Sequence, residues 1–220
     1  MNGSLRGQLN RARDLSAAFA AWDAFNHAAA RERLQVYAAR LPADWKPLFG
    51  ALTGLTDSHP IKQQAAQLLD LYRNAERRFV QGRHDDGVAR LYRLLEWTAQ
   101  WALERHCQVR TADLPADWLP GKTPNREGKF QAGLFEAWGL VSEKTRGPLA
   151  DWHASRREAM LDHLSARNAS ILAHGFAPVT AATGQRFLDW LSGDFLTALV
   201  AETAAAGIRQ LPPQLPARCV

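Results

Sequence analysis

The sequence predicts an all-α protein: a helical bundle with a helical extension in front of it. Apolar residues recur every three or four positions over most of the 220 residues, as on one face of a helix. Glycine and proline gather in a few breaks between these stretches, and no segment alternates apolar and polar residues as a half-buried strand does. A hydrophobic fraction of 46% with eight tryptophans can form a packed core.

Residues 1–57 are predicted to form the N-terminal helical extension. A first helix is expected from Leu5 to Phe25, because apolar residues recur there at helical spacing, namely Leu9, Leu15, Phe19 and Trp22. A turn at Asn26-His27 leads into a second helix over 28–41. Pro42 and Pro47 then bracket a loop.

Residues 58–207 are predicted to form the bundle itself, followed by an extended tail over 208–220 that contains three prolines. A loop rich in proline and glycine is expected over 108–128. The apolar spacing predicts five helices in this part of the chain, at 61–80, 88–107, 130–141, 149–174 and 180–206.

Charge and cysteine content limit the partners and the compartment. A net charge of +5 and a pI of about 9.6 fit an anionic partner, although arginine- and alanine-rich proteins often have a high pI without one. Cys107 and Cys219 are too few for a disulfide framework or a zinc cage, so we expect a reducing cytoplasm. We find no signal peptide, and the apolar stretch 195–206 is too short to span a membrane.

The candidate site lies late in the chain, where Arg167, Ser170 and His174 precede Gly175. Arg167 and His174 are almost two helical turns apart, so their side chains leave the same face of a helix about 10 Å apart, with Ser170 between them. Gly175 resembles a residue that ends a helix. His174 would then lie in the last turn, where the helix dipole favours the imidazolium form.

An arginine and a histidine on one helix face suit phosphodiester chemistry. A guanidinium group can bind phosphate oxygens through two hydrogen bonds and stabilise the charge that builds in the transition state. An imidazole exchanges protons near neutral pH, so it can serve the 2′-hydroxyl or the leaving 5′-oxygen of RNA.

The string RNASILAHG at 167–175 resembles the Arg-(4 to 6)-His motif of HEPN ribonucleases. It is most similar to the CARF–HEPN group of CRISPR-associated type III ancillary nucleases, and the resemblance extends over roughly 60–180. The segment 83–96 resembles the first helix pair of that group. The resemblance implies a dimerising helical bundle in which two motifs face each other and cut single-stranded RNA without a metal. Arg167 and His174 would be catalytic, and Asn168 and Ser170 would support them.

Most members of that group also carry a CARF domain, an α/β module that binds cyclic oligoadenylate. No stretch of these 220 residues resembles it. Regulation by a domain that senses cyclic oligoadenylate would therefore have to come from outside this chain.

Other interpretations of the same residues remain open. Arg167 could be a surface arginine paired with Glu158 or Asp162, and His174 could cap the end of its helix. Ser170 could be a nucleophile with His174 as its base, but no strand–turn–helix elbow is visible. The three histidines His153, His163 and His174 do not share a helical face, so we expect no metal.

Two further groups have a functional and a structural interpretation. The loop residues Lys122, Arg126 and Lys129 could guide an RNA backbone or could be ordinary solvated charges. Arg93 and Glu96 could form a surface ion pair, or one of them could orient Arg167.

The sequence therefore predicts a metal-independent endoribonuclease without cofactors, acting on single-stranded RNA as a homodimer. RNA cleavage would proceed by attack of the 2′-hydroxyl and leave a 2′,3′-cyclic phosphate. The setting would be CRISPR-linked antiviral defence. Two alternatives are a HEPN toxin of a toxin–antitoxin pair and a non-catalytic helical module that binds RNA or protein.

Overall fold

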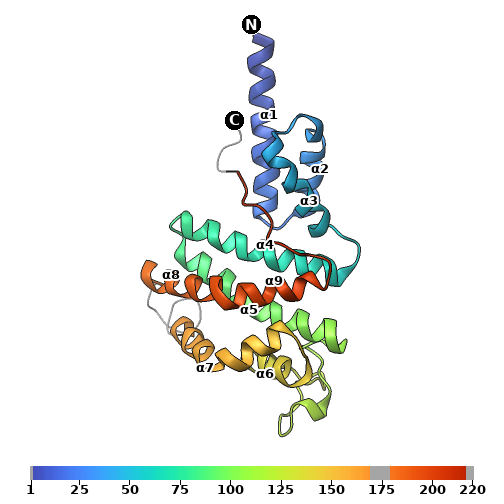
Figure 1. Cartoon of the computed structure of the whole chain (residues 1–220), viewed down its shortest axis with the longest axis vertical. Coiled ribbons are helices and arrows are strands. Elements are labelled where there is room, and N and C mark those ends of the chain that lie inside the picture. Colours follow the sequence, from blue (N-terminus) through green and yellow to red (C-terminus); the bar gives the residue numbers. More distant parts are fainter. Residues whose placement is uncertain (1, 169–178, 217–220) are drawn as a thin grey trace.

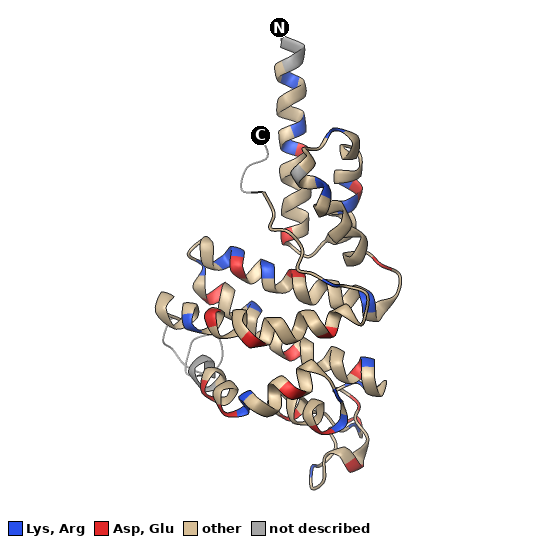
Figure 2. Ribbon diagram, viewed as in Figure 1, with Lys and Arg blue, Asp and Glu red and all other residues tan. Residues whose placement is uncertain are grey.

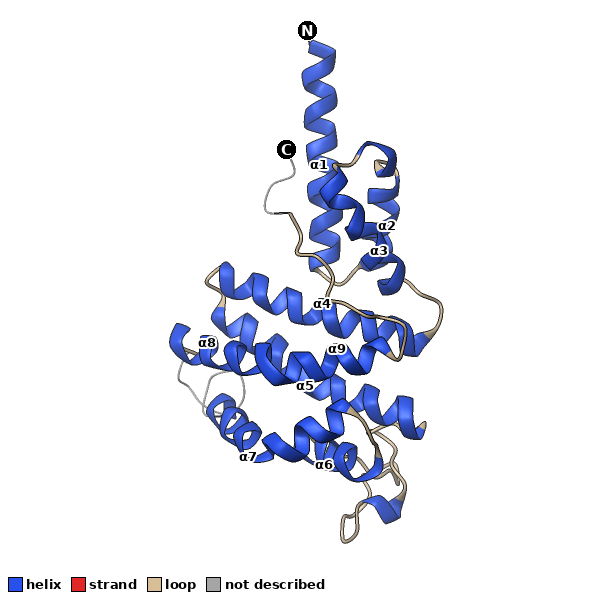
Figure 3. Cartoon of the chain, viewed as in Figure 1, coloured by secondary structure: helices blue, strands red, loops and turns tan. Residues whose placement is uncertain are grey.

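The computed structural model describes residues 2–168 and 179–216, the side chains at 2–4, 44 and 165–168 excepted. Figure 3 shows helices joined by loops, and no strand forms in these ranges. The only β-type pairing there consists of two isolated bridges, Arg110 with Asp113 and Leu114 with Phe130. The all-α prediction is confirmed.

Three helices, α1 (Asn2–Asp23), α2 (His27–Gln35) and α3 (Lys46–Leu55), form the N-terminal part. They enclose a separate small core of leucines and aromatic rings, among them Leu15, Trp22, Leu34 and Leu52. The start of α1 stands away from the rest of the molecule (Figure 1), and Leu5 and Leu9 on it are exposed.

The second helix is shorter than the 28–41 that the sequence predicts. It ends at Gln35 and is followed by two 3-10 turns, η1 (Ala38–Arg40) and η2 (Ala43–Trp45). Pro42 explains why the helix does not continue through Leu41, since the residue before a proline avoids the helical conformation. Leu41 is accordingly extended, with φ −73° and ψ 148°.

The bundle consists of α4 (Pro60–Val80), α5 (His84–Cys107), α6 (Leu134–Lys144), α7 (Pro148–Asn168), α8 (Ala181–Trp190) and α9 (Leu196–Ala204). Helix α5 is central, because it packs against α4, α6 and α8. The main core lies around it, and its largest fully buried side chains include Trp101, Trp138 and Phe195. None of the helices in the described ranges combines the length and the apolar character that a membrane span requires.

Three predicted helices of the bundle have different bounds, and the helix predicted over 88–107 begins already at His84. The helix predicted over 130–141 begins only at Leu134, where Gly133 N donates to Glu136 Oε2 at 2.9 Å, while Phe130 pairs with Leu114. The single helix predicted over 180–206 is interrupted by a π-helical turn, η4 (Leu191–Phe195). Gly193 lies outside the helical region there, with φ −83° and ψ −118°, a conformation that glycine tolerates best.

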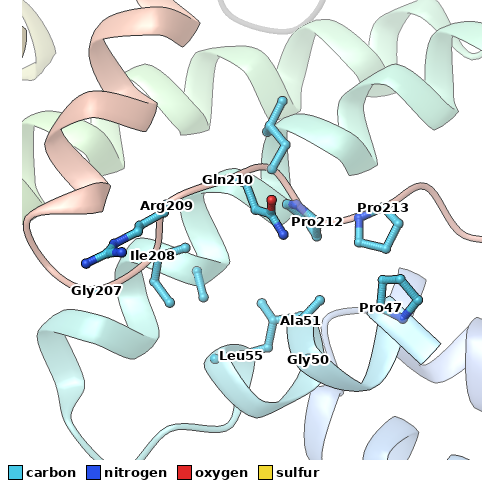
Figure 4. Close-up of a pocket in the computed structure, with 13 residues that line it drawn as sticks. Pro47, Gly50, Ala51, Leu55, Gly207, Ile208, Arg209, Gln210, Pro212 and Pro213 are labelled. Carbon is cyan, nitrogen blue, oxygen red and sulfur yellow. The ribbon is translucent and has the colours of Figure 1, made fainter. Parts of the chain in front are cut away.

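The chain after α9 runs along α4 toward the N-terminal part. Arg73 Nε donates to Pro212 O at 2.9 Å, and Gln214 Nε2 donates to Glu76 Oε2 at 2.7 Å. The returning segment and α3 enclose an apolar cavity of about 260 Å³ (Figure 4), and Ile208 packs against both cores.

A buried polar network joins α4 to the N-terminal part. Asp70, which is 1% exposed, accepts hydrogen bonds from Trp22 Nε1 at 3.0 Å and pairs with His27 Nε2 at 3.1 Å. Burial alone would raise the pKa of Asp23, but hydrogen bonds from Arg78 and Arg77 lower it below 3.8. The N-terminal part is therefore attached to the bundle by charged as well as apolar contacts.

Candidate functional site

Helix α7 carries the start of the Arg167–His174 motif. Its inward face is apolar and buried, with Leu149, Met160 and Leu164 packed in the main core. Position 167 is seven residues beyond Met160, so it lies on that same inward side of the helix. Glu158 lies on the opposite side of α7, as its 3.6-residue repeat requires.

Of the four predicted catalytic residues, Arg167 and Asn168 lie in the final turn of α7 as the structure describes it. Their side chains are not described, and Ser170 and His174 lie outside the described residues. The chain is described again from Val179, whose backbone N–H donates to Asp85 Oδ1 at 3.1 Å near the start of α5. The described residues on either side of 169–178 therefore lie at the end of α7 and beside the start of α5.

His163 lies one turn before Arg167 and has an aromatic environment. Its ring stacks on Trp190 with a centroid distance of 4.5 Å, and on Phe187 at 5.6 Å. Burial lowers the pKa of His163 below 6.5, with Asp162 opposing this shift and Arg186 adding to it. The lowered pKa favours the neutral ring, which packs between α7 and α8.

His153 also has a structural environment. It is 2% exposed, its Nδ1 is 2.6 Å from Ser142 Oγ, and its ring stacks on Trp138 at 5.6 Å. Burial, with the nearby Arg157, lowers the pKa of His153 to about 4. In the described ranges no three histidine, cysteine or carboxylate residues are grouped as metal ligands.

The loop cations predicted to bind RNA lie at the opposite end of the bundle from the end of α7 (Figure 1). Lys122 Nζ is 2.5 Å from Glu136 Oε2, and Lys129 Nζ is 3.3 Å from Glu127 Oε2. Arg126 is exposed. Figure 2 shows Lys and Arg interspersed with Asp and Glu along the bundle helices. The loop cations are thus not brought together with position 167.

Arg93 and Glu96 form the surface ion pair that one interpretation of the sequence predicts. Arg93 Nη1 is 2.7 Å from Glu96 Oε2, and the guanidinium group also lies 5.5 Å from the centre of the Trp97 ring.

Sequence reasoning missed a small cavity beside the motif helix. It lies between α7 and η4, measures about 270 Å³, and its lining includes Trp152, Arg156, Trp190 and Asp194. Two tryptophans separated by 38 positions were visible in the sequence, but only the packing of α7 against η4 brings their rings to 5.6 Å.

The family comparison agrees with this all-α bundle. A family model described as the Csm6 HEPN domain matches residues 58–194, which is more than half of the chain and includes the whole of 167–175. The class of protein is therefore a CRISPR-associated HEPN domain, and this chain belongs to the Csm6 HEPN domain family. That family suggests a ribonuclease function in a CRISPR context. A search of curated proteins found no match.

Proposed function

We propose that this chain is a metal-independent endoribonuclease that cleaves single-stranded RNA in CRISPR-linked defence. The observation that carries the proposal is the family match over 58–194, because it spans all of 167–174, the first two residues of which lie in the final described turn of α7. An arginine and a histidine are the side chains that such cleavage requires, one for charge and one for protons.

The register of α7 supports a functional arginine over a surface ion pair. Position 167 follows the inward side of the helix, whereas Glu158 and Asp162 lie on the far side.

In the proposed reaction the RNA supplies its own nucleophile. The 2′-hydroxyl gives up its proton, O2′ forms a bond to the adjacent phosphorus, and the bond from phosphorus to O5′ breaks. The departing O5′ takes a proton, so the products are a 2′,3′-cyclic phosphate and a 5′-hydroxyl. Arg167 would bind the phosphate oxygens, His174 would transfer a proton, and Asn168 and Ser170 would hold the substrate or these two groups.

A homodimer suits this chemistry. One group must accept the proton at O2′ while another provides one at O5′, and a single histidine is not both at once. Two copies of His174, facing one another across a two-fold axis, would supply both groups. The RNA would then lie in a groove between the two motifs.

The test compares His174→Ala and Arg167→Ala with the unchanged protein in a denaturing-gel assay of a uridine- or adenosine-rich RNA. We expect both variants to lose at least 100-fold in rate, as removal of a general acid–base group does, by about 10²- to 10⁴-fold. His59→Ala is the matched control, since His59 is exposed at the start of α4, and it should cleave normally.

The same assay addresses the mechanism and the alternatives. The unchanged protein should cleave in EDTA, and its 3′ fragments should carry a 5′-hydroxyl. Cleavage that persists in His174→Ala, or that EDTA abolishes, contradicts the mechanism. RNA that binds to the protein but stays intact would instead favour the non-catalytic helical module. A HEPN toxin would use the same site, so genomic context separates that alternative.

A further inference from the structure

The cavity between α7 and η4, here called the α7 pocket, has the chemistry of a base-binding site. Its lining consists of Trp152, Arg156, Ala159, Trp190, Gly193 and Asp194. Trp152 is buried, whereas Trp190 is half-buried and forms part of the pocket wall. At about 270 Å³ the pocket is slightly smaller than sites for drug-sized ligands, so it suits a single planar group.

A kink in the chain shapes this pocket. Gly193 departs from the helical φ and ψ inside η4, so the chain bends between α8 and α9. Gly193 contributes no side chain to the pocket, and a Cβ built there would have no atom within 4 Å. The turn thus leaves open space beside two indole rings, where a nucleobase could stack.

The pocket is aligned with the motif along α7. Arg156 precedes Arg167 by eleven residues, which is three helical turns, so the two positions share a face about 16 Å apart along the axis. His163 lies between them on the same side and stacks on Trp190. A strand bound at position 167 can therefore reach Arg156 within a few nucleotides.

Arg156 is held by a contact that a phosphate can replace. Its Nε donates to Asp194 Oδ2 at 3.1 Å, and its Nη2 contacts the same oxygen. Both side chains are substantially exposed, at 48% and 64%, and exposed ion pairs of this kind contribute little stability. In the free protein Asp194 thus pairs with the guanidinium group of Arg156, and it would compete with an RNA phosphate for that group.

We propose that the α7 pocket is an RNA subsite, in which a base a few nucleotides from the scissile bond packs against Trp190 while Arg156 binds the adjoining phosphate. This inference rests on the proposed ribonuclease function and specifies how its substrate is held. Cleavage of a long strand then depends on the pocket, whereas cleavage of a dinucleotide that cannot reach it does not.

The test uses two variants that remove the same ion pair, Arg156→Ala and Asp194→Ala, in the full chain. If the pair were only structural, the two variants would behave alike. In the proposed subsite Arg156→Ala raises KM for a long single-stranded RNA about tenfold, the size expected for a lost charge-assisted hydrogen bond. Asp194→Ala lowers that KM severalfold, because the guanidinium group is freed and a repelling carboxylate is removed.

A dinucleotide substrate provides the internal control, and both variants should cleave it at the wild-type rate. Equal effects of the two variants on long RNA, or a loss that is as large on the dinucleotide, overturn the subsite while leaving the ribonuclease in place. An unchanged protein that cleaves no RNA overturns the proposed function and the subsite with it. Matched thermal unfolding of the two variants verifies that their folds are equally intact.

Discussion

At the scale of single residues, His153 shows how burial alters a titratable group. Its ring is stacked on Trp138, its Nδ1 contacts Ser142, and its Nε2 has no hydrogen-bond partner in the described part of the chain. A proton on this ring would bring an unpaired charge into the core, which is why the pKa of His153 falls to about 4.

This buried histidine predicts a pH dependence of stability. Above pH 6.5 the ring is neutral in both the folded and the unfolded state, so His153 makes its full contribution to the free energy of unfolding. Between pH 6.5 and about 4 the unfolded chain binds a proton that the folded chain does not. The free energy of unfolding therefore decreases as the pH is lowered through this range, by up to about 3 kcal/mol. Below about pH 4 both states bind it and this contribution levels off.

Urea titrations of the wild type and of His153→Phe, from pH 7 to pH 4, measure this effect. We expect a shallower pH dependence in the variant, because phenylalanine keeps the ring stacking without the titration. The difference between the two slopes is the readout, since the carboxylates and His163 are common to both proteins. Parallel slopes would show that His153 is protonated as readily in the folded chain as in the unfolded one.

At the scale of elements, two glycines let α8 and α5 close around Phe79, which lies at the end of α4. A Cβ at Gly87 would lie 2.6 Å from Phe79 Cε2, and one at Gly184 would lie 2.8 Å from Phe79 Cε1. Real Cβ atoms do not approach that closely. The packing of α5 and α8 against Phe79 therefore depends on glycine at both positions.

We predict that Gly87→Ala and Gly184→Ala each lower the free energy of unfolding by about 1–3 kcal/mol, the usual effect of overpacking a core. Gly139→Ala on α6 is the matched control, because nothing lies within 4 Å of a Cβ there. That variant should gain up to about 1 kcal/mol from the better helix propensity of alanine. Chemical denaturation measures all three, and similar stabilities for Gly87→Ala and Gly139→Ala would contradict the steric explanation.

The sequence predicted these elements better than it predicted their ends. Apolar spacing identified the helices from Leu15 to Leu199 because their buried faces follow the 3.6-residue repeat. Local chemistry set the bounds instead, through Pro42 after the shortened second helix and the Gly133–Glu136 contact at the start of α6. The break at Gly193 had no signature, since a glycine inside an apolar helical pattern is often tolerated.

At the scale of the whole molecule, the candidate site was predictable in part. The Arg167–His174 spacing and its resemblance to a nuclease motif could be found in the sequence alone. The cavity formed by Trp152, Trp190 and Arg156 could not, because residues far apart in the chain line it only after α7 and η4 pack together. Distant residues are brought together by tertiary packing, which no local pattern encodes.

A composite site predicts that activity depends on protein concentration. If two copies must meet to place two His174 side chains, the rate per chain should fall on dilution below the dimer dissociation constant. Light scattering and cleavage assays over the same concentration series should give matching midpoints. A constant rate per chain across a range in which the mass falls from dimer to monomer would show that one copy suffices.

The carboxylate of Asp70 has a consequence for how the two cores find each other. Apolar surfaces can shift relative to one another with small changes in energy, whereas a buried carboxylate is stable only where hydrogen-bond donors meet it. If α1 and α2 docked in a displaced position, Asp70 would lose its contacts with Trp22 and His27. Asp70 thus makes one docking position of α1 and α2 on the helical bundle more favourable than displaced positions.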